Sequence, residues 1–278
     1  MSKCRIIKEI RGQKAVDGAG VHLVRVLGLN DVKDFDPFLM LDSFDSVDAA
    51  DYIEGFPMHP HRGIETITYL IEGEIEHEDS LGNRGVISSG ETQWMTSGSG
   101  ILHQEMPQKA ERMLGLQLWL NMPQGKKMAE PAYLSITKDM IGTKEVGSNT
   151  VKVLSGRYEE VAGVEPKHVP ATIYDVHLLK GEEIELPVNK EETVFVFLID
   201  GDAYIEDKRI PSKTAVLFDK GDSISLLAPK DSESRIIFFS ATPLHEPIAW
   251  GGPVVMNTQE ELNHAFEELR KGTFIKHK

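Results

Sequence analysis

The sequence has a single cysteine, no long apolar run and fewer basic than acidic residues, and each shortage excludes a class of protein. Cys4 is the only cysteine, so no internal disulfide forms and nothing demands an oxidising compartment. The longest apolar run, Val194 to Ile199, has six residues, whereas a membrane-spanning helix needs roughly 20. The first residues carry charges around a short apolar pair, unlike a signal peptide. We therefore expect a soluble, cytoplasmic protein.

Charge and missing motifs narrow the function further. The 44 acidic residues outnumber the 30 basic ones and give a formal net charge of -14 at pH 7. On average such a surface repels nucleic-acid phosphates and anionic lipids, so we expect neither direct nucleic-acid binding nor membrane association. The chain also lacks the glycine-rich phosphate loop of nucleotide-binding proteins and the Gly-x-Ser-x-Gly turn of hydrolases.

Short apolar or alternating segments, separated by glycine-containing turns, dominate the rest of the chain. Such segments predict β-strands, because alternate residues of a strand face opposite sides of a sheet. Many short strands joined by tight turns are typical of an all-β sandwich or barrel. The predicted strands are Val21–Val26, Ile64–Ile71, Ile75–Glu78, Thr92–Met95, Gly115–Leu120, Thr193–Ile199, Ala215–Phe218, Ser223–Leu227 and Arg235–Phe239.

Length and an internal repeat indicate two domains. The 278 residues exceed the usual size of one domain. The segment Glu65–Glu74 resembles Glu192–Asp202 with one residue inserted, and both are apolar strands that end in an acidic-Gly-acidic turn. The intervening stretch is rich in glycine and lysine and is typical of a crossover. We predict an N-terminal domain at 1–125, a linker at 126–148 and a C-terminal domain at 149–278.

The last segment of the chain predicts a short C-terminal helix that packs on a sheet. Thr258 and Glu261 have the spacing of a capping box, and Gly272 follows as a stop. Apolar residues recur between them at helical spacing, at Leu262, Ala265, Phe266 and Leu269.

Two pairs of metal-ligand residues are the most informative pattern in the chain. His59 and His61 lie two residues apart, as do His103 and Glu105, and residues at this spacing share one face of a strand. The strands predicted between the pairs let the chain return beside its starting strand. Pro60 fits only a strand entrance or edge, because it has no N–H to donate. Three imidazoles and one carboxylate suit Fe, Mn, Co, Ni or Zn, and an octahedral ion would keep two positions open for dioxygen or an organic substrate.

Other candidates compete with this set. Glu65 lies four residues after His61, so a regular strand would point it to the same face as a rival carboxylate. His77 sits at a predicted strand end, where we expect a solvated structural role. Trp94 is a candidate for the cavity mouth. The remaining histidines without paired neighbours are interpreted as structural or surface residues, namely His168, His177, His245, His264 and His277.

Several motifs together resemble the pirin family of the cupin superfamily, and the resemblance covers nearly the whole chain. The motifs are Asp36-Pro-Phe-Leu-Met-Leu-Asp42, His59-Pro-His-Arg-Gly-Ile-Glu65-Thr, Gln93-Trp-Met, Gly100-Ile-Leu-His-Gln-Glu105-Met-Pro107 and Gly252-Pro-Val-Val-Met-Asn-Thr-Gln-Glu260-Glu261. The resemblance implies two cupin-type β-barrel domains, a bicupin, with one metal ion in the N-terminal barrel and none in the C-terminal one.

The same resemblance implies a ligand set and a metal. The pirin ligands fall on His59, His61, His103 and Glu105, and the ion is normally Fe(II), with Mn, Co, Ni and Zn as alternatives. The general cupin pattern offers Glu65 as the carboxylate instead. The pirin-like His-x-Glu favours Glu105 and leaves Glu65 as a partner that orients a ligand.

Two functions follow from the resemblance, together with a plainer third. The first is quercetin 2,3-dioxygenase activity, in which O₂ cleaves a flavonol ring and carbon monoxide is released, with Glu105 as the general base that takes the substrate's hydroxyl proton. The second is a transcriptional co-regulator that responds to the oxidation state of iron and binds a regulatory protein partner. The third is a cupin whose metal only stabilises the barrel. We expect a monomer.

Overall fold

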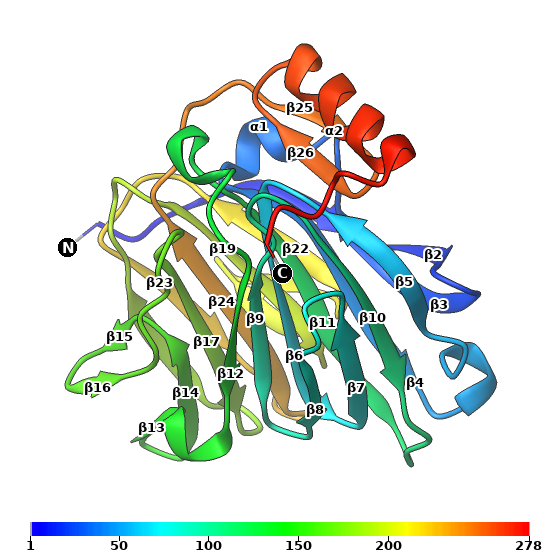
Figure 1. Cartoon of the computed structure of the whole chain (residues 1–278). Helices are drawn as coiled ribbons and strands as arrows, with labels where there is room; N and C mark the ends of the chain where they lie inside the picture. Colours follow the sequence, from blue (N-terminus) through cyan, green and yellow to red (C-terminus); the bar gives the residue numbers. More distant parts are fainter. Residues whose placement is uncertain (1, 278) are drawn as a thin grey trace. The chain divides into compact units, whose positions relative to one another are not determined.

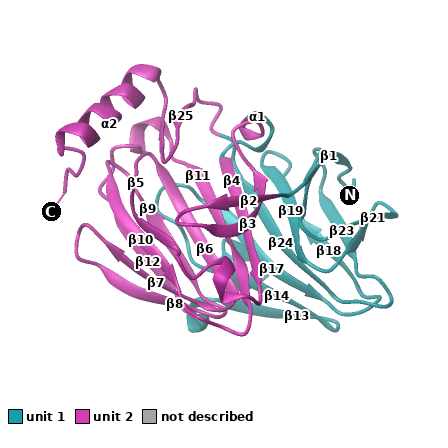
Figure 2. Cartoon of the chain, turned by 90° about the vertical axis from the view of Figure 1, so that its right-hand side faces the viewer, with its two compact units in different colours: residues 1–13, 33–37, 138–243 teal, residues 14–32, 38–137, 244–278 magenta. Residues whose placement is uncertain are grey.

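The computed structural model describes residues 2–277, which fold mainly into β-strands (Figure 1). The chain divides into two compact units, each assembled from separate segments (Figure 2). Unit 1 comprises residues 1–13, 33–37 and 138–243, and unit 2 comprises residues 14–32, 38–137 and 244–278. Among the described residues, no helix is long and apolar enough to cross a membrane.

Unit 2 contains a seven-stranded and a four-stranded sheet. The larger sheet has the order β12 (Ala132–Ile136), β9 (Thr92–Thr96), β6 (Ile64–Glu72), β11 (Met113–Asn121), β4 (Phe38–Ser46), β3 (Val21–Leu27), β2 (Gln13–Asp17). The smaller sheet has the order β5 (Phe56–His61), β10 (Ile101–Pro107), β7 (Glu74–Asp79), β8 (Arg84–Ser88). A buried apolar cluster joins them, with Leu23, Leu70 and Met113 from the larger sheet and Ile75 and Ile87 from the smaller. The two sheets therefore enclose one interior.

Unit 1 repeats this plan. Its seven-stranded sheet has the order β1 (Ile6–Arg11), β22 (Thr214–Phe218), β19 (Thr193–Asp200), β24 (Ser234–Ala241), β17 (Ala171–Leu178), β14 (Asn149–Ser155), β13 (Gly142–Val146). Its four-stranded sheet has the order β18 (Glu183–Pro187), β23 (Ser223–Leu227), β20 (Ala203–Ile205), β21 (Lys208–Ile210), and a short pair is formed by β15 (Arg157–Tyr158) and β16 (Val161–Ala162). Apolar side chains from the seven-stranded sheet, such as Val176 and Val196, and from the four-stranded sheet, such as Leu226, fill its interior.

The shared strand order agrees with the repeat found in the sequence. β6 lies between β9 and β11 in unit 2, and β19 lies between β22 and β24 in unit 1. Each ends in the acidic-Gly-acidic turn, where Gly73 and Gly201 have φ angles of 110° and 73°. Residues other than glycine rarely adopt such positive φ values, which explains why both turns contain glycine. The predicted all-β fold with two barrels is confirmed.

The C-terminal helix is confirmed in detail. α2 (Gln259–Lys271) begins after Thr258, whose side chain accepts from the Glu261 N–H, while the Glu261 side chain accepts from the Thr258 N–H. It ends at Gly272 in the left-handed conformation. The helix packs its apolar face, which includes Leu262 and Ala265, against the hairpin of β25 (Ala249–Gly251) and β26 (Val254–Met256). The other helical segments are short: α1 (Val32–Phe35), η1 (Ala49–Asp51), η2 (Gln124–Lys126) and η3 (Lys138–Met140).

The compact units differ from the predicted division into 1–125, 126–148 and 149–278. The expected linker contains β12, which pairs with β9 in unit 2, and β13, which pairs with β14 in unit 1. The first strand, β1, pairs with β22 of unit 1, and residues 244–278 belong to unit 2. Apart from the hairpin of β13 and β14, these pairings connect residues that are far apart in sequence, so local composition carries no sign of them.

Candidate metal centre

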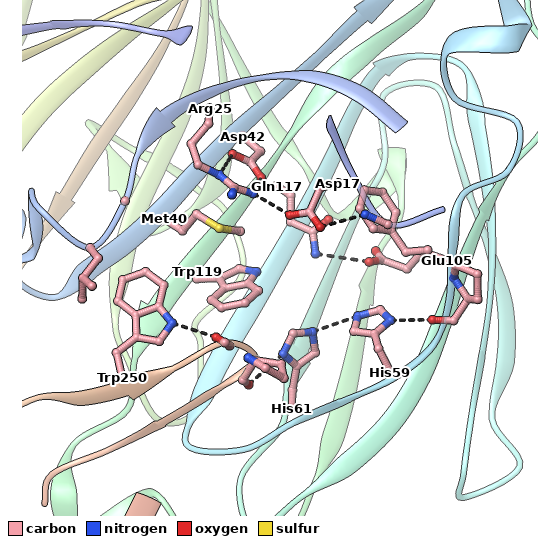
Figure 3. Close-up of a pocket in the computed structure, with 17 residues that line it drawn as sticks. Asp17, Arg25, Met40, Asp42, His59, His61, Glu105, Gln117, Trp119 and Trp250 are labelled. Atoms are coloured by element: carbon pink, nitrogen blue, oxygen red, sulfur yellow. Dashed lines mark hydrogen bonds and ion pairs between the residues drawn. The ribbon is translucent and has the colours of Figure 1, made fainter. Parts of the chain in front are cut away.

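Two paired strands of the small sheet bring three histidines together. β5 and β10 run antiparallel, with His59 opposite His103, and His61 lies two residues further along β5. One ring nitrogen from each imidazole lies within 4.8 Å of the other two. β5 is the edge strand of its sheet, which confirms the position expected for Pro60. The predicted histidine cluster is therefore present in unit 2, and Figure 3 shows two of its members, His59 and His61.

The hydrogen bonds of His59 and His61 fix where their lone pairs point. His59 Nδ1 lies 2.9 Å from the Pro57 carbonyl, and His61 Nδ1 lies 3.1 Å from the Pro253 carbonyl. A carbonyl only accepts, so both Nδ1 atoms carry the hydrogen and both Nε2 atoms carry lone pairs. These two Nε2 atoms are only 3.0 Å apart. Two lone pairs at this distance repel each other unless a cation lies between them.

His103 adds a third neutral imidazole. It is fully buried, and neither of its ring nitrogens has a hydrogen-bond partner among residues 2–277. Burial, together with the neighbouring His59, lowers the pKa of His61 to about 3, and burial also lowers the pKa of His103 well below its usual range. His61 and His103 are thus suited to donate lone pairs at neutral pH. Together with the Nε2 lone pair of His59, this donor set fits a divalent transition metal.

Glu105 lies beside the histidines but has other partners. It is two residues beyond His103 on β10 and is 2% exposed. Together with His59 and His61 it lines a cavity. Its carboxylate accepts hydrogen bonds from Thr68 Oγ1 at 3.0 Å and from Gln117 Nε2 at 3.2 Å. The group of close ligand atoms found in the described chain contains the three histidines and not Glu105. Ligation by Glu105 therefore stays a prediction.

Glu65 lies on the opposite face of the large sheet, which corrects its interpretation as a rival or orienting carboxylate. Thr68 of β6 contacts Glu105, and Glu65, three residues earlier on the same strand, has the opposite orientation. Its carboxylate accepts from Trp94 Nε1 at 3.0 Å and Thr96 Oγ1 at 2.7 Å. Trp94 therefore does not border the cavity mouth either. The expectation for a regular strand failed because the turn after His61 separates β5 from β6.

The prediction for His77 is corrected as well. It lies opposite Glu105 in the pairing of β10 with β7 and is 7% exposed, so it is buried and not solvated. Its ring stacks on Tyr133, with centroids 5.4 Å apart. Burial lowers its pKa. His77 thus helps to fill the barrel interior behind the histidine cluster.

A cavity of about 580 Å³ opens onto the cluster. Its apolar walls include two indoles, Trp119 and Trp250, with Met40 and Phe56. Figure 3 shows Gln117 and Asp17 beside Glu105, with Arg25 and Asp42 further from the histidines. Asp17, Arg25 and Asp42 form a polar group in the cavity. The volume lies within the range of small-molecule sites.

Two buried cations hold the turn that follows His61. Arg62 is 1% exposed, and its guanidinium donates to the Ser99 carbonyl, to Glu268 Oε2 and to the Phe274 carbonyl. Lys127 is also 1% exposed. Its Nζ donates to the Gly63 and Val255 carbonyls and to Asn121 Oδ1, over 2.6 to 3.0 Å. Both side chains connect the turn to the C-terminal segment by hydrogen bonds. No role was predicted for either residue from the sequence.

Comparison with known proteins agrees with this architecture. Two family models match the chain, Pirin over residues 20–120 and the Pirin C-terminal cupin domain over residues 173–275. A pirin-like protein of Caulobacter vibrioides is 41% identical over 97% of this chain and 98% of its own length. The chain belongs to the pirin family.

Solved structures extend the comparison for this member of the pirin family. A quercetin 2,3-dioxygenase from Acinetobacter baumannii has a TM-score of 0.90 at 28% identity, over 98% of this chain and 99% of that one. A bacterial pirin from Escherichia coli, solved in complex with nickel(II), has a TM-score of 0.66 at 22% identity, over 85% of this chain and 99% of that one. The second likeness concerns the fold alone.

Proposed function

We propose that the protein binds one divalent metal ion, iron(II) in the first place, and catalyses the O₂-dependent 2,3-cleavage of a flavonol-like ring with release of carbon monoxide. The observation that carries the proposal is the pair of Nε2 atoms 3.0 Å apart, whose Nδ1 atoms both face carbonyls. The fold shared with a quercetin 2,3-dioxygenase over nearly the whole chain supports the substrate class. His59, His61, His103 and Glu105 are the proposed ligands.

The donor set leaves the identity of the metal open among several ions. Imidazoles and one carboxylate accept Fe, Mn, Co, Ni or Zn, and availability in the cell often decides among them. Elemental analysis of protein purified without added metal identifies the resident ion. We expect close to one ion per chain, and no bound ion in a His61→Ala variant. A full complement of metal in that variant would contradict the assigned site.

The protein's own residues bind the substrate and move one proton. When bound, the metal supplies a Lewis acid that stabilises the oxyanion of the substrate's 3-hydroxyl. Glu105 takes the proton of that hydroxyl on a carboxylate oxygen, while Thr68 and Gln117 hold the carboxylate by hydrogen bonds. Trp119 and Trp250 offer flat apolar faces to the aromatic rings and exclude water from them.

Turnover tests the proposal directly. The protein is loaded with iron(II) under anaerobic conditions and mixed with a flavonol and O₂. We expect the flavonol absorbance to fall and an equivalent amount of carbon monoxide to appear. Consumption of no flavonol by fully loaded protein, across several flavonols, would remove the dioxygenase proposal.

A Glu105→Gln variant tests the base. We expect it to lower kcat by about 100-fold or more, because general bases contribute on the order of 100- to 10,000-fold. The metal content and the kcat are measured on the same sample, so loss of metal is distinguished from loss of the base. Glu65→Gln is the matched control, because it replaces a buried carboxylate on the other face of the sheet. Equal kcat for Glu105→Gln and the native protein would exclude the base role.

A further inference from the structure

A polar row crosses the cavity floor beside an apolar row. Gln117, Asp42 and Arg25 are register neighbours on β11, β4 and β3, so they share one face of the sheet. Adjacent strands lie about 4.8 Å apart, so the row extends about 10 Å from Gln117 to Arg25. Trp119 and Met40 form the neighbouring pair two residues along, and both line the cavity. The floor therefore matches a flat molecule with one polar end that faces this row.

The far end of the row is an organised charge cluster. Arg25 binds Asp42 through Nε at 2.9 Å and Nη2 at 2.7 Å, and Nη2 also donates to Asp17 at 2.7 Å. Burial alone would raise the pKa of Asp17, but the hydrogen bonds from Arg25 and the Gly18 N–H outweigh it and lower that pKa. Two carboxylates and one guanidinium leave a formal charge of about one negative unit. Such a cluster accepts hydrogen bonds from hydroxyl groups and disfavours anions.

One buried donor on the cavity wall points to the same kind of ligand. The Trp119 side chain is nine-tenths buried and its Nε1 has no hydrogen-bond partner in the part of the chain that the structure describes. The other indole of the cavity, Trp250, donates to the Gly252 carbonyl at 2.8 Å. An unpaired buried N–H is unfavourable. A ligand oxygen, such as a ring carbonyl or ether, would satisfy it.

We propose that Asp17, Arg25 and Trp119 select planar aromatic compounds that carry hydroxyl groups at the end that faces this charge cluster. A distal hydroxyl donates to Asp17, held in place by Arg25, and an oxygen in the middle of the ligand accepts from Trp119 Nε1. The preferred ligand class is thus the neutral polyhydroxylated flavonoid type. This inference rests on the proposed function, because the near end of the ligand occupies the metal site.

Equilibrium binding without O₂ tests the selection separately from turnover. The metal-loaded protein is titrated with two flavonols, one with an unsubstituted phenyl ring and one with a catechol ring. We expect the native protein to bind the catechol compound about 10-fold more tightly, since one hydrogen bond to a charged group contributes a difference of this order. In Asp17→Asn the preference should fall to about 2-fold. Asp231→Asn, an exposed aspartate of unit 1, is the control and should keep the native preference.

A second variant keeps the test decisive if Asp17→Asn folds poorly. Trp119→Phe retains an aromatic ring and removes the N–H, so it should lower the affinity for both flavonols by a similar factor of about 5. Three results would overturn the inference. The native protein could bind the two flavonols with equal affinity, it could bind neither, or Asp17→Asn could lower the affinity for both by the same factor. A protein that shows the preference but never consumes flavonol would disprove the dioxygenase and leave the selection intact.

Discussion

Lys127 is a single residue on which the geometry near the proposed site depends. Its ammonium is buried and contacts three neutral oxygen acceptors, from Gly63, Asn121 and Val255. Burial lowers the pKa of this group to about 7, although Glu246 and Glu261 oppose the shift. In the unfolded chain the ordinary value of 10.5 returns. Between these values the unfolded chain holds more protons than the folded chain, so stability rises with pH in this interval.

A Lys127→Met variant should remove that pH dependence. We expect the free energy of unfolding of the metal-free native protein, relative to the variant, to rise by up to about 1.4 kcal/mol per pH unit above pH 7. Urea unfolding of both proteins in chelator at several pH values measures the difference. Lys180→Met, at an exposed position, is the control. A pH-independent difference between native protein and Lys127→Met would show that Lys127 keeps its proton throughout.

Residue patterns predicted the histidine cluster and missed what surrounds it. The spacing of His59, His61 and His103 was sufficient, because alternation along a strand fixes the face that each side chain takes. Neither Thr68 nor Gln117 was predicted. Gln117 is a polar residue at an inward position of the mainly apolar strand β11, and that interruption is a signal that could have identified it. Thr68 has no such signal, because β6 also contains Glu65, Thr66 and Glu72. The partner of Thr68 and Gln117, Glu105, lies on another sheet, and no local pattern identifies a contact between sheets.

At the scale of elements, the strands and the terminal helix could be predicted from the sequence. Which strands pair with one another could not. Predicted and observed bounds agree to within a few residues, as for Ile64–Ile71 and β6 (Ile64–Glu72). Alternation and capping act within one element, so they can be recognised in the sequence. The orientation that a strand takes after a turn cannot be recognised in this way. The change of direction at Gly63, with φ of 77°, turned Glu65 away from the cavity.

Helix α2 is linked to the proposed metal site through a buried ion pair. Arg62 Nη1 lies 2.7 Å from Glu268 Oε2, and the two side chains are 2% and 11% exposed. An uncompensated buried charge typically costs about 3 to 5 kcal/mol, and Arg62→Met should cost less than this because Lys276 also pairs with Glu268. Because Arg62 directly follows His61, we expect Arg62→Met to lower both the stability and the metal affinity.

The double variant separates the ion pair from general damage. Arg62→Met together with Glu268→Leu replaces both charges by apolar groups and should recover part of the stability lost in Arg62→Met. Urea unfolding of the native protein, both single variants and the double variant gives the coupling energy, and a metal titration of each gives the effect on the site. Additive losses in the double variant would show that the two residues act independently.

At the scale of the whole molecule, two barrels of the same strand order carry different interiors. In unit 1, the strands that correspond to β5 and β10 are β18 and β23, and their sequences, EIELP and SISLL, contain no histidine. The sequence predicted the duplication because β6 and β19 keep similar residues. It did not predict that the terminal segments join the unit built from the other half of the chain, because strand pairing and buried ion pairs over such separations depend on the folded structure.

The return of residues 244–278 to unit 2 predicts how a fragment behaves. A fragment of residues 1–137 contains all four proposed ligands but loses the Pro253 carbonyl that orients His61 and the partners of Arg62 and Lys127 in the C-terminal segment. The two buried basic groups would keep only part of their hydrogen-bond partners, which destabilises the turn after His61. We expect the isolated fragment to take up no metal, whereas co-expression with residues 138–278 restores uptake, as elemental analysis of the purified proteins would measure. One tightly bound ion per isolated fragment would contradict this dependence.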